Sequence, residues 1–383
     1  MSHIRALAAD IGPRPTGQPP EERARAYIRR ALAEVEITSL EEQPFLTRPT
    51  IGMAFAIPLN LALAGNLLSL AGRVGTLIGG VATLFSAAAV WRLYGGQRSP
   101  LELLEPRFPS ANLIARLAPA DTPRHTVVLI GHTDTQKKQT IAEPQYKQAM
   151  LRVTTSWLAI LLINGCAQLA QLTGAKWLPR IVQWFSAAML GMTLRQAWGE
   201  ERHSFVAGAN DNATAVACLL GLGAYLKRRP LRQTEVWLAF TGAEEVMCVE
   251  MHHFLDRYGA DLRNAWFIDF EMVGTDTIAY VTRHSGLSYL HAYTPDAESL
   301  ALAEQTGQRR PDLQVGQREM VIVEEVGCLR GRGFRGICLV GVGPDGWLAN
   351  WHLYSDTVDN IVPAGVERAA RFALAMLETL DVS

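Results

Sequence analysis

The sequence predicts an α/β layer fold with a mostly parallel sheet, and two observations support this prediction. Short apolar runs at 126–131, 235–241 and 336–342 have the length and composition of buried strands. Helical patterns lie between and after them, at 213–228 and 364–380. Strands that alternate with helices along a chain favour a parallel sheet with helices packed on it.

Further elements fit the same arrangement. We expect a helix over 20–35, where apolar and charged residues alternate at helical spacing directly after Pro19. Strands are expected at 112–117, beside the strand at 126–131, and at 265–274. With 383 residues, the chain is long enough to bury a full hydrophobic core.

Composition and charge exclude several classes of function. The formal net charge is −1 and 19% of the residues are charged, so we expect no nucleic-acid partner. The five cysteines are scattered and form no CxxC pair, which argues against a disulfide framework and against a thiolate zinc site. This cysteine usage fits a reducing compartment.

Two pairs of apolar runs interrupt the α/β pattern. The runs 51–71 and 74–91 are uncharged, and so are 153–173 and 181–194. Each pair predicts a helical hairpin inserted into the α/β domain. The chain then divides into one domain and two hairpins, with the domain at 1–50, 96–152 and 198–383 and the hairpins at 51–95 and 153–197.

The hairpins are the main clue to location. Because about 20 apolar residues span a bilayer core of about 30 Å, the first and third runs are long enough to cross, the second is marginal and the fourth is short. Cations gather at the ends next to the α/β domain, which favours a membrane-associated protein with a cytoplasmic domain. They are Arg48, Arg92, Arg98, Lys147, Arg152, Arg195 and Arg202, against Arg73, Lys176 and Arg180 in the turns.

An alternative location stays open. In a soluble cytoplasmic protein, residues 51–91 and 153–194 would be buried helices that form a lid or the interface of a homodimer.

Chemically reactive side chains follow the predicted strands. Glu244 and Glu245 come directly after the strand at 235–241. Adjacent side chains there point in different directions, so one carboxylate can bind a metal while the other moves a proton. His132 ends another strand, and Asp134 follows on the same side of the chain, where it can orient the imidazole.

Further carboxylates and a second histidine complete the set. Asp211 stands at the start of a helix, where the free N–H groups favour an ionised carboxylate. Asp269 and Glu271 share one face of a strand, and His352 precedes Asp356 in a loop. Imidazole and carboxylate ligands with one shared aspartate are what a pair of zinc ions about 3.5–4 Å apart requires.

The chain resembles the M28 family of zinc metallopeptidases, which have a three-layer α/β/α fold. The resemblance covers about residues 10–35, 110–136, 206–275 and 335–375 and includes the opening "IGPRPTGQPPEERARAYIRRAL". It implies two zinc ions per chain, and cobalt or manganese would accept the same ligands. Carried onto this chain, it implies that one ion is held by His132 and Glu271 and the other by Glu245 and His352, with Asp211 as the bridge and Glu244 as the general base.

One ligand departs from the family pattern. Glu271 stands where the family commonly has an aspartate in a "DMVG" segment, and Asp269 is the alternative ligand. Asp134, Asp269 and Asp356 are expected to hold the ligands in position from behind.

The activity that the resemblance implies is a two-zinc aminopeptidase acting on short peptides. Two alternatives stay open: a glutaminyl-cyclase-like transamidase with one zinc, and an inactive peptidase-like membrane module. Since no ligand position is eroded, the sequence favours the hydrolase.

Overall fold

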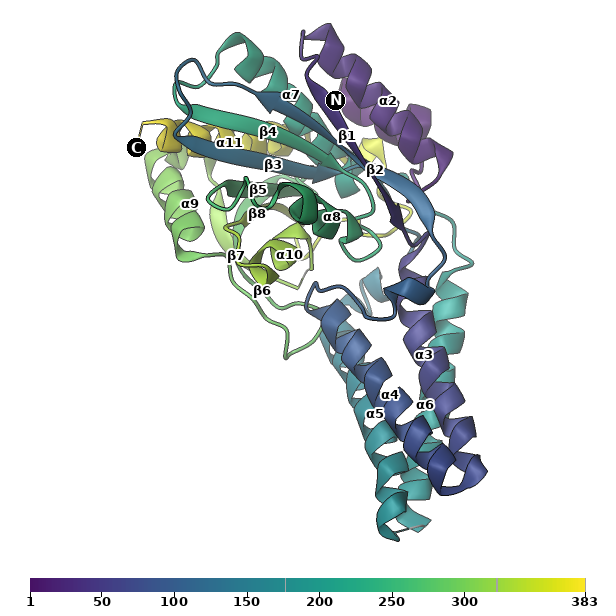
Figure 1. Cartoon of the computed structure of the whole chain (residues 1–383). Coiled ribbons are helices and arrows are strands. Elements are labelled where there is room, and N and C mark those ends of the chain that lie inside the picture. Colours follow the sequence, from purple (N-terminus) through teal and green to yellow (C-terminus); the bar gives the residue numbers. More distant parts are fainter. Residues whose placement is uncertain (176, 322, 383) are drawn as a thin grey trace.

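A single mixed sheet organises the α/β part of the molecule (Figure 1). The computed structural model describes residues 1–383 apart from 176, 322 and 383. Its strands lie side by side in the order β1-β2-β4-β3-β5-β8-β6-β7. Their bounds are β1 Leu40–Thr47, β2 Phe108–Leu117, β3 His125–His132, β4 Thr234–Thr241, β5 Trp266–Glu271, β6 Thr277–His284, β7 Gly316–Met320 and β8 Ile337–Val342.

The four central strands are parallel, as the sequence predicts. β4, β3, β5 and β8 pair in parallel register, while β2 joins β4, β1 joins β2 and β6 joins β8 in antiparallel register. The expected strand at 265–274 ends earlier, at Glu271, because Met272 takes a left-handed backbone with φ 52°. Strands β1, β6 and β7, which sequence reasoning did not find, extend the sheet at its two edges.

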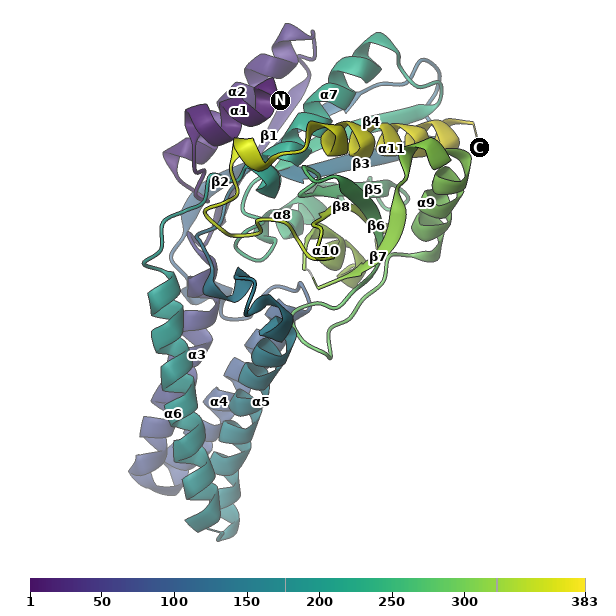
Figure 2. The ribbon, with the colours of Figure 1, turned by 180° about the vertical axis from the view of Figure 1, so that it is seen from behind.

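Helices cover both faces of the sheet, which confirms the predicted three-layer α/β/α arrangement (Figure 2). Val127 and Leu129 of β3 belong to the core on one face, and Val128 and Ile130 belong to the core on the other. The first face is covered by α1 Ser2–Arg5, α2 Pro19–Glu34, α7 Thr214–Arg228, α9 Ala297–Arg309 and α11 Pro363–Asp381. The second face is covered by α8 Val249–Tyr258 and α10 Glu325–Gly331.

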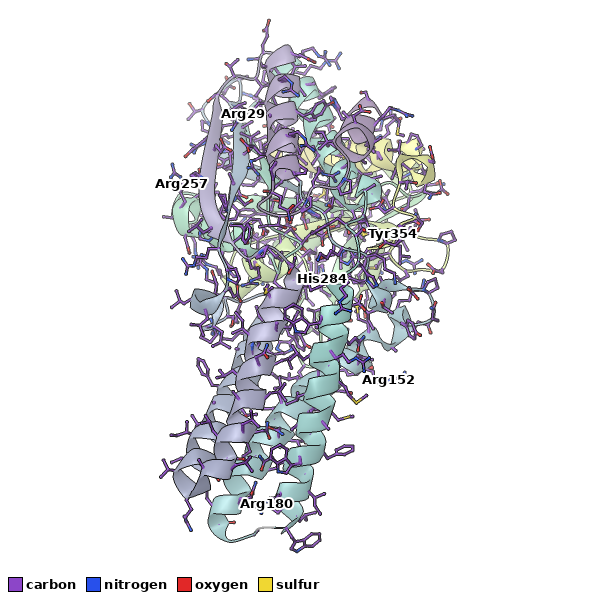
Figure 3. The ribbon with its side chains drawn as sticks, turned by 90° about the vertical axis from the view of Figure 1, so that its right-hand side faces the viewer. Arg29, Arg152, Arg180, Arg257, His284 and Tyr354 are labelled. Atoms are coloured by element: carbon purple, nitrogen blue, oxygen red, sulfur yellow. The ribbon has the colours of Figure 1, made fainter. Side chains whose placement is uncertain are left out.

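The apolar runs form four long helices that extend away from the sheet as one bundle (Figure 1). These helices are α3 Ile51–Leu68, α4 Gly72–Tyr94, α5 Met150–Ala170 and α6 Trp177–Glu200. They have 18, 23, 21 and 24 residues, so each is about 27–36 Å long at about 1.5 Å per residue. The short run at 181–194 is therefore part of a much longer helix. Figure 3 shows Arg180 at the end of the bundle far from the sheet.

Polar side chains pair with each other inside the bundle. The Asn66 amide nitrogen donates to Asn164 Oδ1 at 3.0 Å, and the Gln168 amide nitrogen donates to the same oxygen at 2.8 Å and to Thr83 Oγ1 at 2.9 Å. Gln183 donates to Ser69 Oγ at 2.7 Å. Since these amides are buried, their hydrogen bonds replace those that water would otherwise make.

The outside of the bundle is apolar. Within the described residues, most of the exposed large apolar side chains of the chain lie on these four helices and on the turn between α3 and α4. By length and composition, the stretches Ile51–Tyr94 and Lys147–Thr173 are apolar enough to cross a membrane. The bundle thus differs from a usual soluble helical bundle, because its exterior is apolar while its interior holds hydrogen-bonded amides beside an apolar core.

A close approach of α11 to the loop after β5 generates a prediction about stability. A Cβ atom on Gly365 would lie 1.7 Å from the backbone oxygen of Thr275, so α11 must shift to admit it. We expect Gly365→Ala to lower the free energy of unfolding by about 1–3 kcal/mol. Gly221→Ala in α7 is the control, because its Cβ meets no atom within 4 Å, and alanine there should add about 0.5–1 kcal/mol. Thermal unfolding followed by circular dichroism measures both, and equal melting temperatures would contradict the expectation.

Candidate metal centre

The predicted site residues converge at the carboxyl ends of the parallel strands. His132 is the last residue of β3, Glu271 is the last residue of β5, and Glu244 and Glu245 lie in the loop directly after β4. His352 lies in the loop after β8. Because parallel strands end at the same edge of a sheet, side chains far apart in the sequence meet there.

Asp211 lies between the two histidines. It precedes α7, and its Oδ1 is 3.2 Å from His132 Nε2 while its Oδ2 is 3.3 Å from His352 Nε2. Burial alone would raise the pKa of this carboxyl, but the hydrogen bonds to the two imidazoles lower it. One carboxylate therefore serves two imidazoles at once, as the bridging role implied by the family resemblance requires.

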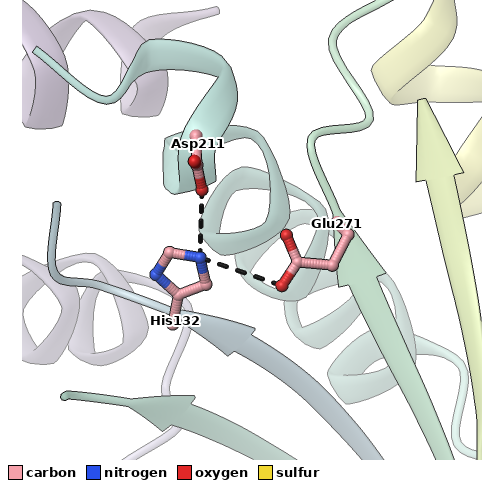
Figure 4. Close-up of side chains that lie close together, drawn as sticks. All are labelled: His132, Asp211 and Glu271. Carbon is pink, nitrogen blue, oxygen red and sulfur yellow. Dashed lines mark ion pairs between the residues drawn. The ribbon is translucent and has the colours of Figure 1, made fainter. Parts of the chain in front are cut away.

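Each histidine has a second carboxylate beside it. Glu271 Oε1 is 3.8 Å from His132 Nε2 (Figure 4), and Glu245 Oε2 is 3.0 Å from His352 Nε2. Two groups of three potential ligands result, one with His132, Asp211 and Glu271 and one with Asp211, Glu245 and His352. Zinc bonds of about 2.0–2.2 Å in a tetrahedral site place ligand atoms about 3.3–3.6 Å apart, so the spacing of both groups suits a zinc ion.

Buried oxygens without partners also fit a cation at this place. Glu245 Oε1 and Glu271 Oε1 are buried and have no hydrogen-bond partner. Burial raises the pKa of Glu271 well above its ordinary value, although His132 opposes the shift. Burial lowers the pKa of His352, but Glu245 and Asp211 outweigh it and raise that pKa to about 9. Since unpaired buried carboxylates are costly, these residues fit bound metal ions.

Asp134 and Asp356 hold ligand segments in place. Asp134 Oδ1 lies 3.4 Å from His132 Nδ1, and the Asp134 carboxylate accepts hydrogen bonds from the backbone nitrogens of Glu244 and Glu245, both at 3.3 Å. The Asp356 carboxylate accepts from the backbone nitrogen of Asp211 at 3.1 Å. Each contact fixes a segment that carries a candidate ligand.

Asp269 lies apart from both ligand groups. Its carboxylate gathers with Glu324 and Cys338 on the second face of the sheet, rather than with His132. Glu271, two residues further along β5, is the side chain that reaches His132. The structure therefore corrects the expectation that Asp269 could replace Glu271 as a ligand.

Glu244 is the carboxylate of this cluster that remains accessible. Its side chain is 11% exposed, whereas those of Glu245 and Glu271 are 3% and 5% exposed. Its Oε2 lies 3.9 Å from His132 Nε2. Burial raises the pKa of Glu244 well above its ordinary value, and His132 opposes the shift. An accessible carboxyl beside the candidate ligands is placed to exchange a proton with a molecule bound there.

Sequence reasoning missed two residues of the centre. Glu325 begins α10 and lies close to Glu244 and Glu271. The sequence feature that could have revealed it is a second pair of adjacent acids after an apolar run, in "VIVEEV". Arg14 is fully buried and donates to the backbone oxygens of Thr133 at 2.7 Å and Gly208 at 2.7 Å. Burial lowers the pKa of Arg14 to about 10, while nearby carboxylates oppose the shift.

The chain matches one protein-family model in sequence, over part of its length. The model of peptidase family M28 matches residues 193–377, which confirms the resemblance to this family over that region. A comparison with curated protein sequences finds no match.

Solved structures show the same fold at low sequence identity. The zinc aminopeptidase BSAP from Bacillus subtilis matches with a TM-score of 0.57 and 13% identity, over 99% of this chain and 94% of that one. A glutaminyl cyclase from Porphyromonas gingivalis matches with a TM-score of 0.57 and 12% identity, over 99% and 96%. A leucine aminopeptidase precursor from Bacteroides thetaiotaomicron matches with a TM-score of 0.56 and 12% identity, over 98% and 94%.

The shared position of Asp211 generates a prediction about metal content. We expect Asp211→Asn to weaken zinc binding at both groups, because one carboxylate serves both. Loss of a residue that only supports a ligand lowers metal affinity by about 10–100-fold, so the loss here should be at least as large. Elemental analysis of purified protein after dialysis against zinc buffers measures this. Asp269→Asn is the control, since it changes a buried carboxylate outside both ligand groups and should leave the zinc content unchanged. Equal zinc in wild type and Asp211→Asn would contradict the assignment.

Proposed function

We propose that this chain, whose residues 193–377 match peptidase family M28, is a zinc-dependent aminopeptidase that removes N-terminal residues from short peptides. One observation carries the proposal: the Asp211 carboxylate lies 3.2 Å and 3.3 Å from the Nε2 atoms of His132 and His352. Glu271 and Glu245 complete the two groups. These five residues would hold two zinc ions, with cobalt or manganese as substitutes.

Glu244 is the proposed proton carrier. Bound zinc ions would polarise the scissile carbonyl and lower the pKa of the attacking water. The Glu244 carboxylate takes a proton from that water and delivers a proton to the leaving amine. Glu244 and Glu245 are adjacent in one loop, with Glu245 at His352 and Glu244 on the side of His132, so binding and proton transfer fall to different carboxylates.

Two observations favour hydrolysis over the other activities of this fold. The group of His132, Asp211 and Glu271 is a second complete ligand set, which a one-zinc cyclase would not need. An inactive module would be expected to have lost at least one ligand, and each expected ligand position holds a side chain that can bind zinc.

Replacement of Glu244 tests the proposed function. We expect Glu244→Gln to keep its zinc but to hydrolyse leucine p-nitroanilide about 100- to 10,000-fold more slowly than wild type, because the proton acceptor is lost. Glu250→Gln is the matched control, since Glu250 is a buried acid of the nearby helix α8 and belongs to neither ligand group. Chelation should abolish the wild-type activity.

A glutaminyl amide assayed in parallel separates the alternatives. Release of glutamine supports the peptidase, whereas conversion to the pyroglutamyl amide with loss of ammonia from the side-chain carboxamide supports a cyclase. A zinc-loaded chain that converts neither substrate would move the assignment to an inactive module.

We also propose that the four-helix bundle spans a membrane, with the α/β domain on the cytoplasmic side. The buried amide pairs and the apolar exterior support this placement. Exposed tryptophans mark both ends, with Trp177 far from the sheet and Trp198 close to it, about 31 Å apart along α6 at about 1.5 Å per residue. That separation equals the thickness of a bilayer core, which is about 30 Å.

The distribution of cations supports the cytoplasmic side. Figure 3 shows Arg152 near the α/β domain and Arg180 at the far end. Arg48 is buried in an ion pair with Glu105 and so contributes no free charge. Lys176, expected in the far turn, lies outside the described residues. The excess of cations next to the domain favours a cytoplasmic orientation.

Cys166 reports on the membrane placement. It is an exposed free cysteine of α5, on the same outward side of the helix as Ile163. We expect a membrane-impermeant maleimide to leave Cys166 unlabelled in native membranes and to label it after denaturation in SDS, because the reactive thiolate does not form in hydrocarbon. Thr122→Cys, at an exposed loop residue between β2 and β3, is the control and should be labelled on opened membranes before denaturation. A soluble chain with rapid labelling of Cys166 would contradict the proposal, and a soluble dimer with Cys166 shielded would support the homodimer interface instead.

A further inference from the structure

A cavity of about 220 Å³ joins the candidate metal centre to the inside of the bundle. Its upper wall contains Asp211, Glu244, Glu245, Glu271 and His352, the residues of the centre. Its lower wall contains side chains from all four bundle helices. A molecule bound at the centre can therefore extend into the bundle.

The cavity follows the bundle helices for several turns. Helix α3 contributes Ile51, Phe55 and Leu59, which recur every four residues and so share one side of the helix. Helix α5 contributes residues from Met150 to Leu161. At about 1.5 Å per residue, these positions extend over about 12–16 Å of helix. The space is long enough for an extended chain rather than for one compact side chain.

The two lysines at the junction between the centre and the bundle are each paired with a glutamate. Lys137 Nζ lies 2.8 Å from Glu201 Oε2, and Lys138 forms an ion pair with Glu143. Both lysines line the cavity, and among its described lining residues no other lysine or arginine is present. The cavity below the centre therefore offers no unpaired lysine or arginine for a peptide carboxylate, and its deeper wall is apolar.

We infer that this cavity holds the hydrocarbon chain of an amphiphilic substrate whose scissile amide lies at Glu244. This inference rests on the proposed aminopeptidase function and names its substrate class: an aminoacyl or short peptidyl amide that carries a long apolar chain. Water adds across the amide, the C–N bond breaks, a C–O bond forms at the carbonyl carbon, and the leaving amine receives a proton. The chain is attached either to the leaving amine or to the N-terminal residue, and both forms fill the same apolar space.

Chain-length dependence of the full-length zinc-loaded protein in lipid nanodiscs tests the inference. One series is leucine alkylamides from ethyl to dodecyl, with the chain on the leaving amine. The other is amides of α-amino acids with side chains from ethyl to decyl. We expect kcat/KM to rise in one of the two series by about threefold to fourfold for each buried methylene until the cavity is full. A flat response in both series would overturn the inference.

Variants separate the cavity from simple partition into lipid. Leu161→Trp narrows the cavity from α5, and Leu59→Trp narrows it from α3 and serves if the first variant does not fold. Either should lower the ratio of long-chain to short-chain kcat/KM by about tenfold or more. Ile163→Trp is the matched control, because Ile163 is 50% exposed on the outside of the same helix. An equal ratio in the cavity variants and in the control would overturn the inference.

The outcomes distinguish this inference from the proposed function. Zinc-dependent hydrolysis of leucine ethylamide without any preference for long chains would support the aminopeptidase function and would overturn the inference of an amphiphilic substrate. If no amide is hydrolysed, the proposed function fails. Binding of a dansyl-labelled long-chain alkylamine then tests whether the cavity accepts an apolar chain. Binding that Leu161→Trp abolishes and Ile163→Trp retains would support the cavity as a site for an apolar chain, and binding unchanged by Leu161→Trp would overturn it.

Discussion

The concentration of buried carboxylates at the carboxyl ends of β3, β4 and β5 is the constraint on which the rest of the centre depends. Asp134, Asp211, Glu245, Glu271 and Asp356 are each buried, and Arg14 and two imidazoles are the cationic or potentially cationic groups described beside them. Carboxylates in such surroundings must be protonated, hydrogen-bonded or paired with a cation. Backbone N–H groups satisfy Asp134 and Asp356, whereas Glu245 and Glu271 retain unpaired oxygens. The protein thus stabilises its supporting carboxylates by itself, and the unpaired oxygens of Glu245 and Glu271 fit the proposed metal ions.

Much of this arrangement could be predicted, because the reactive residues follow directly after the apolar runs that form the parallel strands. Buried parallel strands are short apolar runs, and reactive residues directly after such runs meet at one edge. The edge strands β1 and β7 could not be found in this way, since their sequences "LEEQPFLT" and "GQREM" carry exposed charges and lack an apolar run. The alternation of side chains alone does not choose between Asp269 and Glu271, because it places both on one face of β5 and only position along the strand decides which one reaches His132. The resemblance to the family favours Glu271.

For the bundle, the sequence predicted the helices but not the way in which they pack. Its four helices were visible as apolar runs, but those runs have little periodicity, so the sequence did not say which side of each helix faces its neighbours. The pairing of Asn66 with Asn164 and of Gln168 with Thr83 sets that orientation. Once the amides are inside, residues such as Val81, Phe85 and Ile163 must face outward. These polar pairs, together with the buried apolar residues of the same helices, therefore distinguish the inside of the bundle from its exposed surface.

The second hairpin is a long insertion in the sequence between two candidate ligands, and the chain segments at its two ends pair with each other. Helices α5 and α6 lie between His132 and Asp211 in the sequence. The two chain segments that enter and leave the hairpin pair directly, with Lys138 N donating to Ser204 O at 3.0 Å and Val206 N donating to Gln136 O at 2.9 Å. The Gln136 amide in turn donates to the backbone oxygen of Glu245 at 2.7 Å. These bonds hold the two ends of the insertion together and attach them to the loop that carries Glu245, and the cavity connects the same region to the inside of the bundle.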